Sequence, residues 1–182
     1  MLFLICLFLL PVVSDAENFI EKKSKKLYIG FTVIDLSYKE NNEKKLLSVA
    51  VWYPTLTVSK SFIYCGPTSG NIALDAELYA EKGSCPLLVF SHGYGGSAVS
   101  SVFLAEYLAS RGWIVICPDH NDMDSVFRIS NSNKKRLKRL KLLKNAKSIT
   151  KSTPTDKPKY YYRFNEMKYA LDWILKSEKF SS

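Results

Sequence analysis

A glycine-rich turn, His92-Gly93-Tyr94-Gly95-Gly96, is the segment of this sequence that points most directly to chemistry. Glycines let the backbone take positive φ angles and let a second group approach closely, so peptide N–H groups can point outward. Acyl transfer needs such donors to stabilise its tetrahedral intermediate, and loss of one donor typically costs ~10²–10³ in rate. The alternatives are a tight turn without chemistry and a phosphate-binding loop. The turn lacks the G-x-G-x-x-G spacing and the P-loop lysine of phosphate-binding loops.

The elements around the turn are those of a βαβ unit. Pro86 to Ser91 is a continuous apolar run, typical of a strand buried on both faces of a parallel sheet. The apolar spacing predicts a helix from Ala98 to Arg111, ended by Gly112. Its buried side should carry Val99, Phe103, Leu104, Tyr107 and Leu108. Trp113 to Cys117 is a second buried strand, which should lie parallel to the first.

The flanking segments predict a hairpin before this unit and a helix after it. Leu27 to Tyr38 and Leu46 to Tyr53 read as two antiparallel strands joined by a turn at Asn41-Asn42. The stretch between them and the βαβ unit is irregular, with a short helix expected near Asn71 to Lys82. A helix is predicted from Tyr161 to Lys176. Its apolar face should carry Phe164, Met167, Leu171, Ile174 and Leu175.

Three stretches carry a resemblance to a known family. The central one, PLLVFSHGYGGSAVSSVFLAEYLASRGWIVICPDH, resembles the dienelactone-hydrolase-like and platelet-activating-factor acetylhydrolase-like branch of the α/β-hydrolases. That branch has an apolar strand, S-H-G-x-G-G, a helix ending L-A-S-x-G, a strand and P-D-H. Upstream, VAVWYP is similar to its WYP strand, and downstream YYRFNEMKYALDWIL is similar to the helix before its nucleophile strand. That helix usually begins Arg-Pro-x-Asp, where this chain has Arg163-Phe164-Asn165-Glu166.

The resemblance implies an α/β fold and an ester-cleaving activity. The fold would be an incomplete α/β-hydrolase fold, an N-terminal antiparallel hairpin followed by a parallel βαβ unit. The activity would be that of a serine carboxylic-ester hydrolase on a lipid or short-acyl ester, with phospholipid acetyl esters among the candidates. The Tyr94 backbone N–H would donate to the oxyanion, Gly93 and Gly95 would shape the loop, and His92 would brace it.

The residues that complete this chemistry in the family are not found in the sequence. No G-x-S-x-G motif is present, and the two histidines, His92 and His120, both precede the place where the nucleophile would fall. For Asp119 and His120 we expect capping and loop hydrogen bonds, with a role at the rim of the substrate site as the alternative. Residues 17–182 are therefore expected to form the N-terminal part of a hydrolase domain, without nucleophile or triad base and without triad-dependent turnover. Whether the chain is an enzyme stays open.

Three explanations compete for the missing residues: a partial gene product, a chain that complements a second polypeptide, and a non-catalytic remnant. The alternative function is a secreted, non-catalytic protein that binds lipid or a membrane surface. Hydrophobic residues make up 47% of the 182 residues, which is enough for one compact domain in any of these cases.

The N-terminus predicts export. Residues 1–16 resemble a signal peptide, with an apolar run from Leu2 to Leu10 and cleavage near Ala16, so the protein should be secreted or periplasmic. An oxidising compartment permits disulfides, and Cys65 and Cys85 are either bridged or two free thiols. Cys117 reads as a buried strand residue. No cysteine–histidine spacing fits zinc, and no cofactor or metal is expected.

The formal net charge of +9 is concentrated in one segment, Lys134 to Lys147, which has eight Lys or Arg among fourteen residues and no acid. As a helix it would be amphipathic and attracted to an anionic membrane surface. The alternative is a solvated insertion without a partner. Nucleic acid is not an expected partner, because no aromatic residues interleave these charges. The expected partners are thus an ester substrate, of lipid type among others, and an anionic surface.

Overall fold

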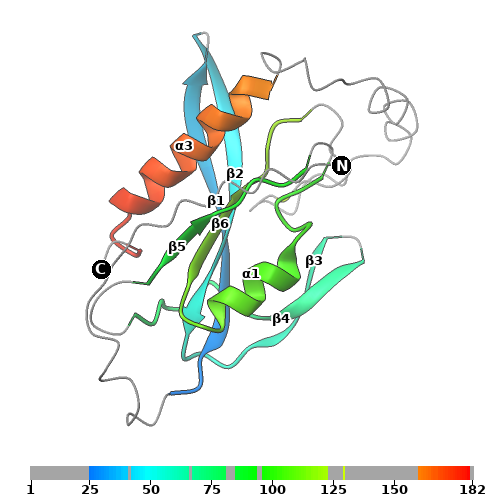
Figure 1. Ribbon diagram of the computed structural model, residues 1–182, viewed down its shortest axis with the longest axis vertical. Coiled ribbons are helices and arrows are strands. Elements are labelled where there is room, and N and C mark those ends of the chain that lie inside the picture. Colours follow the sequence, from blue (N-terminus) through cyan, green and yellow to red (C-terminus); the bar gives the residue numbers. More distant parts are fainter. Residues whose placement is uncertain are drawn as a thin grey trace.

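The computed structural model describes residues 25–40, 42–65, 67–80, 85–93, 96–122, 129 and 160–180. Within these residues, six strands form one mixed sheet and two helices pack against it (Figure 1). In chain order they are β1 (Tyr28–Glu40), β2 (Glu43–Thr55), β3 (Lys60–Cys65), β4 (Thr68–Leu74), β5 (Leu87–Val89), α1 (Val102–Ala109), β6 (Ile114–Pro118) and α3 (Tyr161–Lys176). The predicted signal peptide, residues 1–16, and the basic segment, residues 134–147, lie outside the described residues.

The sheet has the order β3-β4-β1-β2-β6-β5. The predicted hairpin is confirmed: β1 and β2 pair antiparallel from Tyr28 opposite Thr55 to Glu40 opposite Glu43. Asn42 in the connecting turn has a φ of 62°, a left-handed conformation that asparagine tolerates. The βαβ unit is also confirmed, since β5 and β6 run parallel. Together they make the expected α/β fold, with β6 joining the two parts by antiparallel pairing to β2.

Helix α1 is shorter than predicted. It begins at Val102 rather than Ala98, and residues 98–101 form turns instead: the Ser100 N–H donates to the Ser97 carbonyl over 3.0 Å, and the Ala98 N–H donates to Asp119 Oδ1 over 3.0 Å. The predicted end is close to the observed one, and Gly112 has a φ of +89° just after it.

The predicted apolar face of α1 is wrong in part. Phe103 is 74% exposed and Tyr107 is 55% exposed, whereas Ala105 and Ala109 are buried against the sheet. Two small side chains, four residues apart, let the helix backbone approach the sheet closely and turn the large aromatic rings outward. Hydropathy alone favoured the larger residues, but the spacing available above the sheet favours alanine.

The short helix expected near residues 71–82 is wrong, because β3 and β4 form a second antiparallel hairpin there. Strand β4 then joins the sheet by parallel pairing to β1 at Gly30 and Phe31. The hairpin is held to β2 and α1 by polar contacts: Trp52 Nε1 of β2 donates to Tyr64 Oη over 3.0 Å, and Tyr64 Oη donates to Glu106 Oε1 of α1 over 2.8 Å. These partners of Tyr64 are distant in sequence, so local patterns did not reveal how the hairpin is held.

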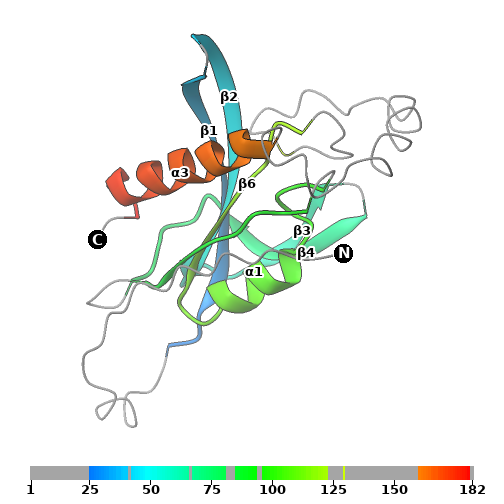
Figure 2. The same ribbon diagram turned by 45° about the horizontal axis from the view of Figure 1, so that its top comes forward.

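The two helices pack against opposite faces of the sheet. Along β2, Ala50 and Trp52 belong to the core cluster beneath α1, while Val49, Val51 and Tyr53 belong to the cluster beneath α3. Helix α3 has the predicted bounds, and it crosses the β1–β2 hairpin below the hairpin's tip (Figures 1 and 2).

The predicted apolar face of α3 is also wrong in part. Phe164 is 59% and Leu175 is 55% exposed, whereas the buried residues are Glu166, Ala170 and Ile174. A buried glutamate near the N-terminal end of the packed face means that polar partners contribute to how the helix is rotated against the sheet. That observation leads to the candidate site.

The cysteines that could have been bridged are free. Cys65 packs against the cluster beneath α1 and Cys85 against the cluster beneath α3, so the sheet separates them. Cys117 is buried, as predicted, and burial raises the pKa of its thiol well above the usual range.

Candidate functional site

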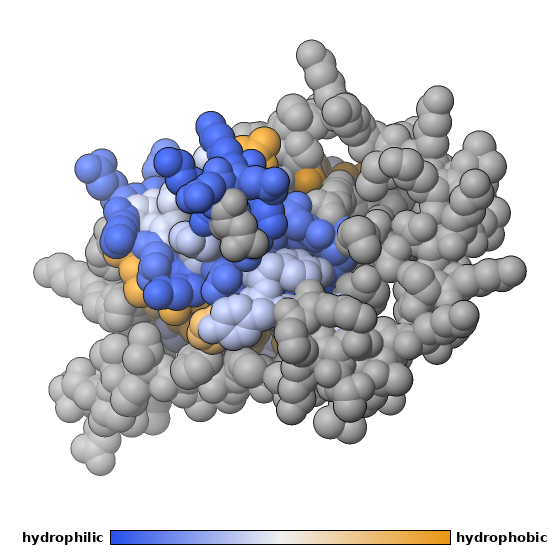
Figure 3. Space-filling model, turned by 90° about the horizontal axis from the view of Figure 1, so that it is seen from above, coloured by the Kyte–Doolittle hydropathy of each residue, from blue (hydrophilic) through white to orange (hydrophobic). Residues whose placement is uncertain are grey.

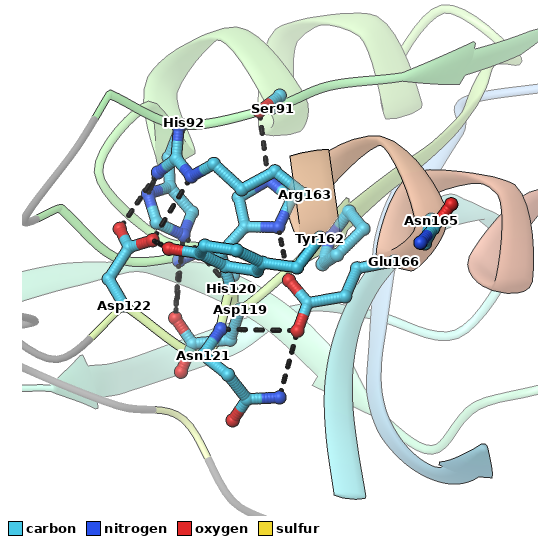
Figure 4. Close-up of polar contacts among 12 residues, drawn as sticks. Ser91, His92, Asp119, His120, Asn121, Asp122, Tyr162, Arg163, Asn165 and Glu166 are labelled. Carbon is cyan, nitrogen blue, oxygen red and sulfur yellow. Dashed lines mark hydrogen bonds and ion pairs between the residues drawn. The ribbon is translucent and has the colours of Figure 1, made fainter. Parts of the chain in front are cut away.

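A buried polar cluster lies at the carboxyl ends of β5 and β6, where the first turns of α3 meet them (Figure 4). Carboxyl ends of parallel strands meet at one sheet edge, where α/β proteins place their ligands. The alternation of side chains between the two faces of the sheet continues past the carboxyl ends of β5 and β6. Asp119 falls on the α1 face, where it accepts the Ala98 N–H, while Ser91 and His120 fall on the α3 face.

Ser91, His120 and Glu166 form a continuous line of hydrogen bonds (Figure 4). The Ser91 Oγ atom lies 2.8 Å from His120 Nε2. On the other side of the ring, His120 Nδ1 lies 2.8 Å from Glu166 Oε2. The side chains of His120 and Glu166 are both 0% exposed, whereas Ser91 is partly exposed. The line therefore runs from the interior of the molecule to its surface.

The Glu166 carboxylate is held by more than the histidine. Its Oε1 atom accepts hydrogen bonds from Tyr38 Oη over 2.9 Å and from Asn121 Nδ2 over 2.8 Å. Burial, and next the negative charge of Glu166, raise the pKa of Tyr38 well above its ordinary value, so its hydroxyl stays a donor. A buried carboxylate needs such donors, because leaving it unpaired would be costly.

His92 is the second buried imidazole of the cluster, with 1% of its surface exposed. Its Nδ1 lies 2.8 Å from the Gly93 carbonyl oxygen, and the His120 backbone N–H donates to its Nε2 over 3.1 Å. These contacts fit a neutral ring that donates from Nδ1 and accepts at Nε2. Burial lowers the pKa of His92 below its ordinary value, which agrees with the neutral form.

An ion pair closes the cluster on the α3 side. Arg163 donates to Asp122 through Nε over 3.0 Å and through a terminal guanidinium nitrogen over 2.8 Å. Tyr162 Oη donates to the same carboxylate. The Asp122 side chain is 0% exposed and that of Arg163 is 16% exposed. Such two-point contact fixes the guanidinium in position. Within the described residues, every buried side-chain nitrogen and oxygen has a hydrogen-bond partner.

The structure describes only part of the predicted oxyanion loop. His92 and Gly93 are described, while Tyr94 and Gly95 lie outside the described residues. Gly93 is exposed, and a Cβ atom there would meet nothing within 4 Å. The Gly96 N–H donates to the Gly93 carbonyl over 3.0 Å. The Gly93 carbonyl is thus contacted both by the His92 ring and by the Gly96 N–H.

Asp119 has the structural role expected from the sequence, because Oδ1 and Oδ2 accept the N–H groups of Ala98 and Ile129. Sequence reasoning did not assign Ser91, Asp122 or Glu166 to a site. One signal was present: Glu166 ends the segment Arg163-Phe164-Asn165-Glu166, which the resemblance sets beside the family's Arg-Pro-x-Asp.

Among the residues that the structure describes, no group of three or more histidine, cysteine or acidic side chains is arranged to hold a metal ion. In the same residues, no helix is both long and apolar enough to cross a membrane.

Comparison with known proteins agrees with this architecture. The sequence pattern of the family described as platelet-activating factor acetylhydrolase, isoform II, matches residues 53–180. The fold is similar to that of a ferulic acid esterase from Streptomyces cinnamoneus, with a TM-score of 0.60 and 19% sequence identity. That similarity covers 87% of this chain and 49% of the esterase, so the chain spans about half the esterase's length. No curated protein shows a significant match to this chain.

Proposed function

Because the chain belongs to the platelet-activating factor acetylhydrolase isoform II family, we propose that it acts in the serine-type hydrolysis of carboxylic esters. The observation that carries this proposal is the contact between the buried His92 ring and the Gly93 carbonyl. It lies at the carboxyl end of the parallel strand β5, inside the residues that match the family. A lipid or short-acyl ester, such as a phospholipid acetyl ester, is the proposed substrate class.

The proposed oxyanion donor is the Tyr94 backbone N–H, with Gly93 and Gly95 shaping the loop and His92 bracing it. Two observations support this role. The space around Gly93 is open to a ligand, and the buried His92 ring bonds to the Gly93 carbonyl. A donor fixed before substrate arrives stabilises developing negative charge without reorganisation at the moment of reaction.

The alternative is a non-catalytic protein that binds a lipid surface. Seen from above, the described surface around the hairpin and α3 is mostly hydrophilic, with small hydrophobic areas (Figure 3). Surface insertion calls for a larger apolar patch than this face shows within the described residues. The buried acid–base cluster also serves hydrolysis better than surface binding.

Export and membrane contact are separate proposals. We propose cleavage near Ala16 and attraction of Lys134–Lys147 to anionic lipid, both supported by the sequence pattern. Co-sedimentation of the chain with vesicles of rising phosphatidylserine content tests the second. Binding should increase with the anionic fraction, and binding indifferent to that fraction would contradict it.

The experiment for ester hydrolysis uses the full 182-residue chain and p-nitrophenyl acetate at neutral pH. The matched background is a double variant, His92→Gln with His120→Gln, which removes the proposed brace of the oxyanion loop and the other histidine of the sequence. Turnover above that background supports the proposal and overturns the expectation from sequence that the chain lacks turnover. A folded chain that hydrolyses the ester no faster than the double variant would contradict it.

A further inference from the structure

The outer edge of β1 extends well beyond the strand that pairs with it there. On its inner side, β1 pairs with β2 along all of its thirteen residues. On its outer side, among the described residues, β4 pairs with it only at Gly30 and Phe31. The rest of the hairpin projects past β4, and its tip lies at the opposite end of β1 (Figures 1 and 2). An edge of this kind is a template for pairing with another strand.

Three contacts show which residues of β1 direct their backbone groups away from β2. The Phe31 carbonyl accepts a backbone N–H from the residue after β4 over 2.9 Å, and the Lys39 carbonyl accepts from Tyr169 Oη over 3.4 Å. The carbonyl of Ser48, the residue opposite Asp35, accepts a backbone N–H from the loop after β6. In an antiparallel pair, residues that bond across the pair alternate with residues that face away from it. The residues of β1 that face outward beyond β4 are therefore Val33, Asp35, Ser37 and Lys39.

The charges along this edge are not matched within the hairpin. Lys39 lies opposite Lys44 of β2, and both residues are exposed. Like charges directly opposite each other destabilise an antiparallel pair. Asp35, four residues earlier on the same face, is also exposed and accepts from Ser48 Oγ over 2.6 Å. An incoming strand with an acid beside Lys39 and a base beside Asp35 would match both charges, whereas an uncharged strand would leave the repulsion in place.

We propose that the outer edge of β1 pairs with the same edge of a second copy of this chain, antiparallel and centred on Ser37. The strand itself carries the pattern that the incoming strand needs. Two-fold pairing about Ser37 sets Asp35 of each copy opposite Lys39 of the other, so both opposite-charge pairs form at once. The three outward residues from Asp35 to Lys39 would exchange N–H···O bonds, and the two sheets would continue as one.

The α3 side of this edge has room for the second copy. A groove of about 360 Å³ lies there, lined by residues 35–38 of β1 and by Tyr169 and Trp173 of α3. Leu36 and Tyr38 alternate with the outward charges and belong to the cluster beneath α3. In the proposed pairing, Leu36 of the second copy lies opposite Tyr38. An apolar side chain would therefore enter the aromatic groove and add hydrophobic contact to the backbone pairing.

The formal net charge of +9 opposes association, because it repels a second copy. At ~0.15 M salt this repulsion is screened beyond ~8 Å, whereas side chains directly opposite each other still interact. The paired edge is short and the interface small, so we expect a weak dimer with a dissociation constant in the micromolar range.

The test is sedimentation equilibrium of the full chain over ~1–200 µM, the range in which a weak dimer is measured. Asp35→Lys makes both charged places basic, and Lys39→Asp makes both acidic, so each should raise the dissociation constant ~10-fold or more. An equimolar mixture of the two variants should recover the dimer, because each lysine then faces an aspartate. Lys60→Asp makes the same charge change at an exposed position of β3, on the other side of the sheet from β5, and should dimerise like the parent.

A further variant tests the backbone pairing itself. Ser37→Pro removes the outward N–H at the centre of the proposed pairing and leaves the bonds between β1 and β2 in place. Proline is accepted on an edge strand where the N–H faces solvent. We expect this variant to be monomeric over the same concentration range and to melt within ~5 °C of the parent chain.

The possible results either support or overturn the pairing. A parent chain that stays monomeric over the whole range overturns the second copy as occupant of this edge. A dimer that persists in both single charge variants also overturns it and points to another edge, such as that of β5. A dimer that both variants lose and their mixture does not recover overturns the register centred on Ser37. Ester hydrolysis is measured separately with p-nitrophenyl acetate, so its presence or absence leaves these results unchanged.

Discussion

His120 Nδ1 lies 2.8 Å from Oε2 of Glu166, a residue 46 positions later in the chain, and neither side chain has exposed surface. This contact joins the loop after β6 to the second turn of α3. It explains why α3 turns a glutamate toward the sheet and leaves Phe164 and Leu175 in solvent. The orientation of the helix is thus set by a directional polar contact and not by hydropathy.

The Asp122–Arg163 ion pair should be essential for docking α3. Asp122→Ala leaves a largely buried guanidinium without its carboxylate, and breaking such a pair by removing one partner typically costs ~3–5 kcal/mol. We expect a loss of that size in the free energy of unfolding, measured by urea denaturation. Glu178→Ala, at an exposed position after α3, is the control and should stay within ~0.5 kcal/mol of the parent. Equal stability of both variants would contradict the role of the pair.

The close approach of α1 to the sheet predicts opposite responses on its two sides. Ala109→Leu adds volume where the side chain is 0% exposed and should destabilise the fold by ~1–3 kcal/mol. Phe103→Ser alters a ring that is 74% exposed and should change stability by less than ~0.5 kcal/mol. Thermal or urea unfolding of the two variants measures the difference. A larger loss of stability for Phe103→Ser than for Ala109→Leu would support the buried face that hydropathy predicts.

The buried imidazoles predict acid sensitivity. Folding lowers the pKa of His92 and of His120 below the ordinary 6.5, mainly because burial disfavours the charged form. Among the charged groups that face them, Arg163 lowers both pKa values further, while Asp122 and, at His120, Glu166 oppose the shift. The unfolded chain therefore binds more protons than the folded chain once the pH falls through about 6.5, so stability decreases below that pH.

The measurement for this prediction is the melting temperature at about pH 7.5 and about pH 5. We expect a fall of ~3 °C or more at the lower pH, and a smaller fall in His92→Gln, which has one fewer buried group to titrate. A melting temperature that is unchanged or higher at the lower pH would show that the two rings are not held neutral by the fold.

Periodicity predicted the elements whose signals are local. Alternation predicted the β1–β2 hairpin, continuous apolar runs predicted the parallel β5–β6 pair, and helical spacing predicted the bounds of α3. The β3–β4 hairpin was missed although its strands are adjacent in sequence, because Gly66, Pro67 and Gly70 interrupt the alternation. The buried faces of both helices were also missed, since alanine and glutamate lie there in place of the larger apolar residues.

The candidate site was likewise predictable from sequence only in part. The glycine-rich turn could be found from sequence because its residues are consecutive, and His92 and Gly93 do lie together at the sheet edge. Ser91, His120 and Glu166 could not be grouped, since they come from three separate elements and meet only through the strand order.

The most direct test of the proposed ester hydrolysis is the turnover of p-nitrophenyl acetate by the full chain. The release of p-nitrophenolate would be measured at neutral pH beside the His92→Gln, His120→Gln double variant, with thermal melting to show that both chains are folded. We predict that the parent chain releases p-nitrophenolate faster than the double variant. A folded parent chain that releases it no faster than the double variant would contradict the account.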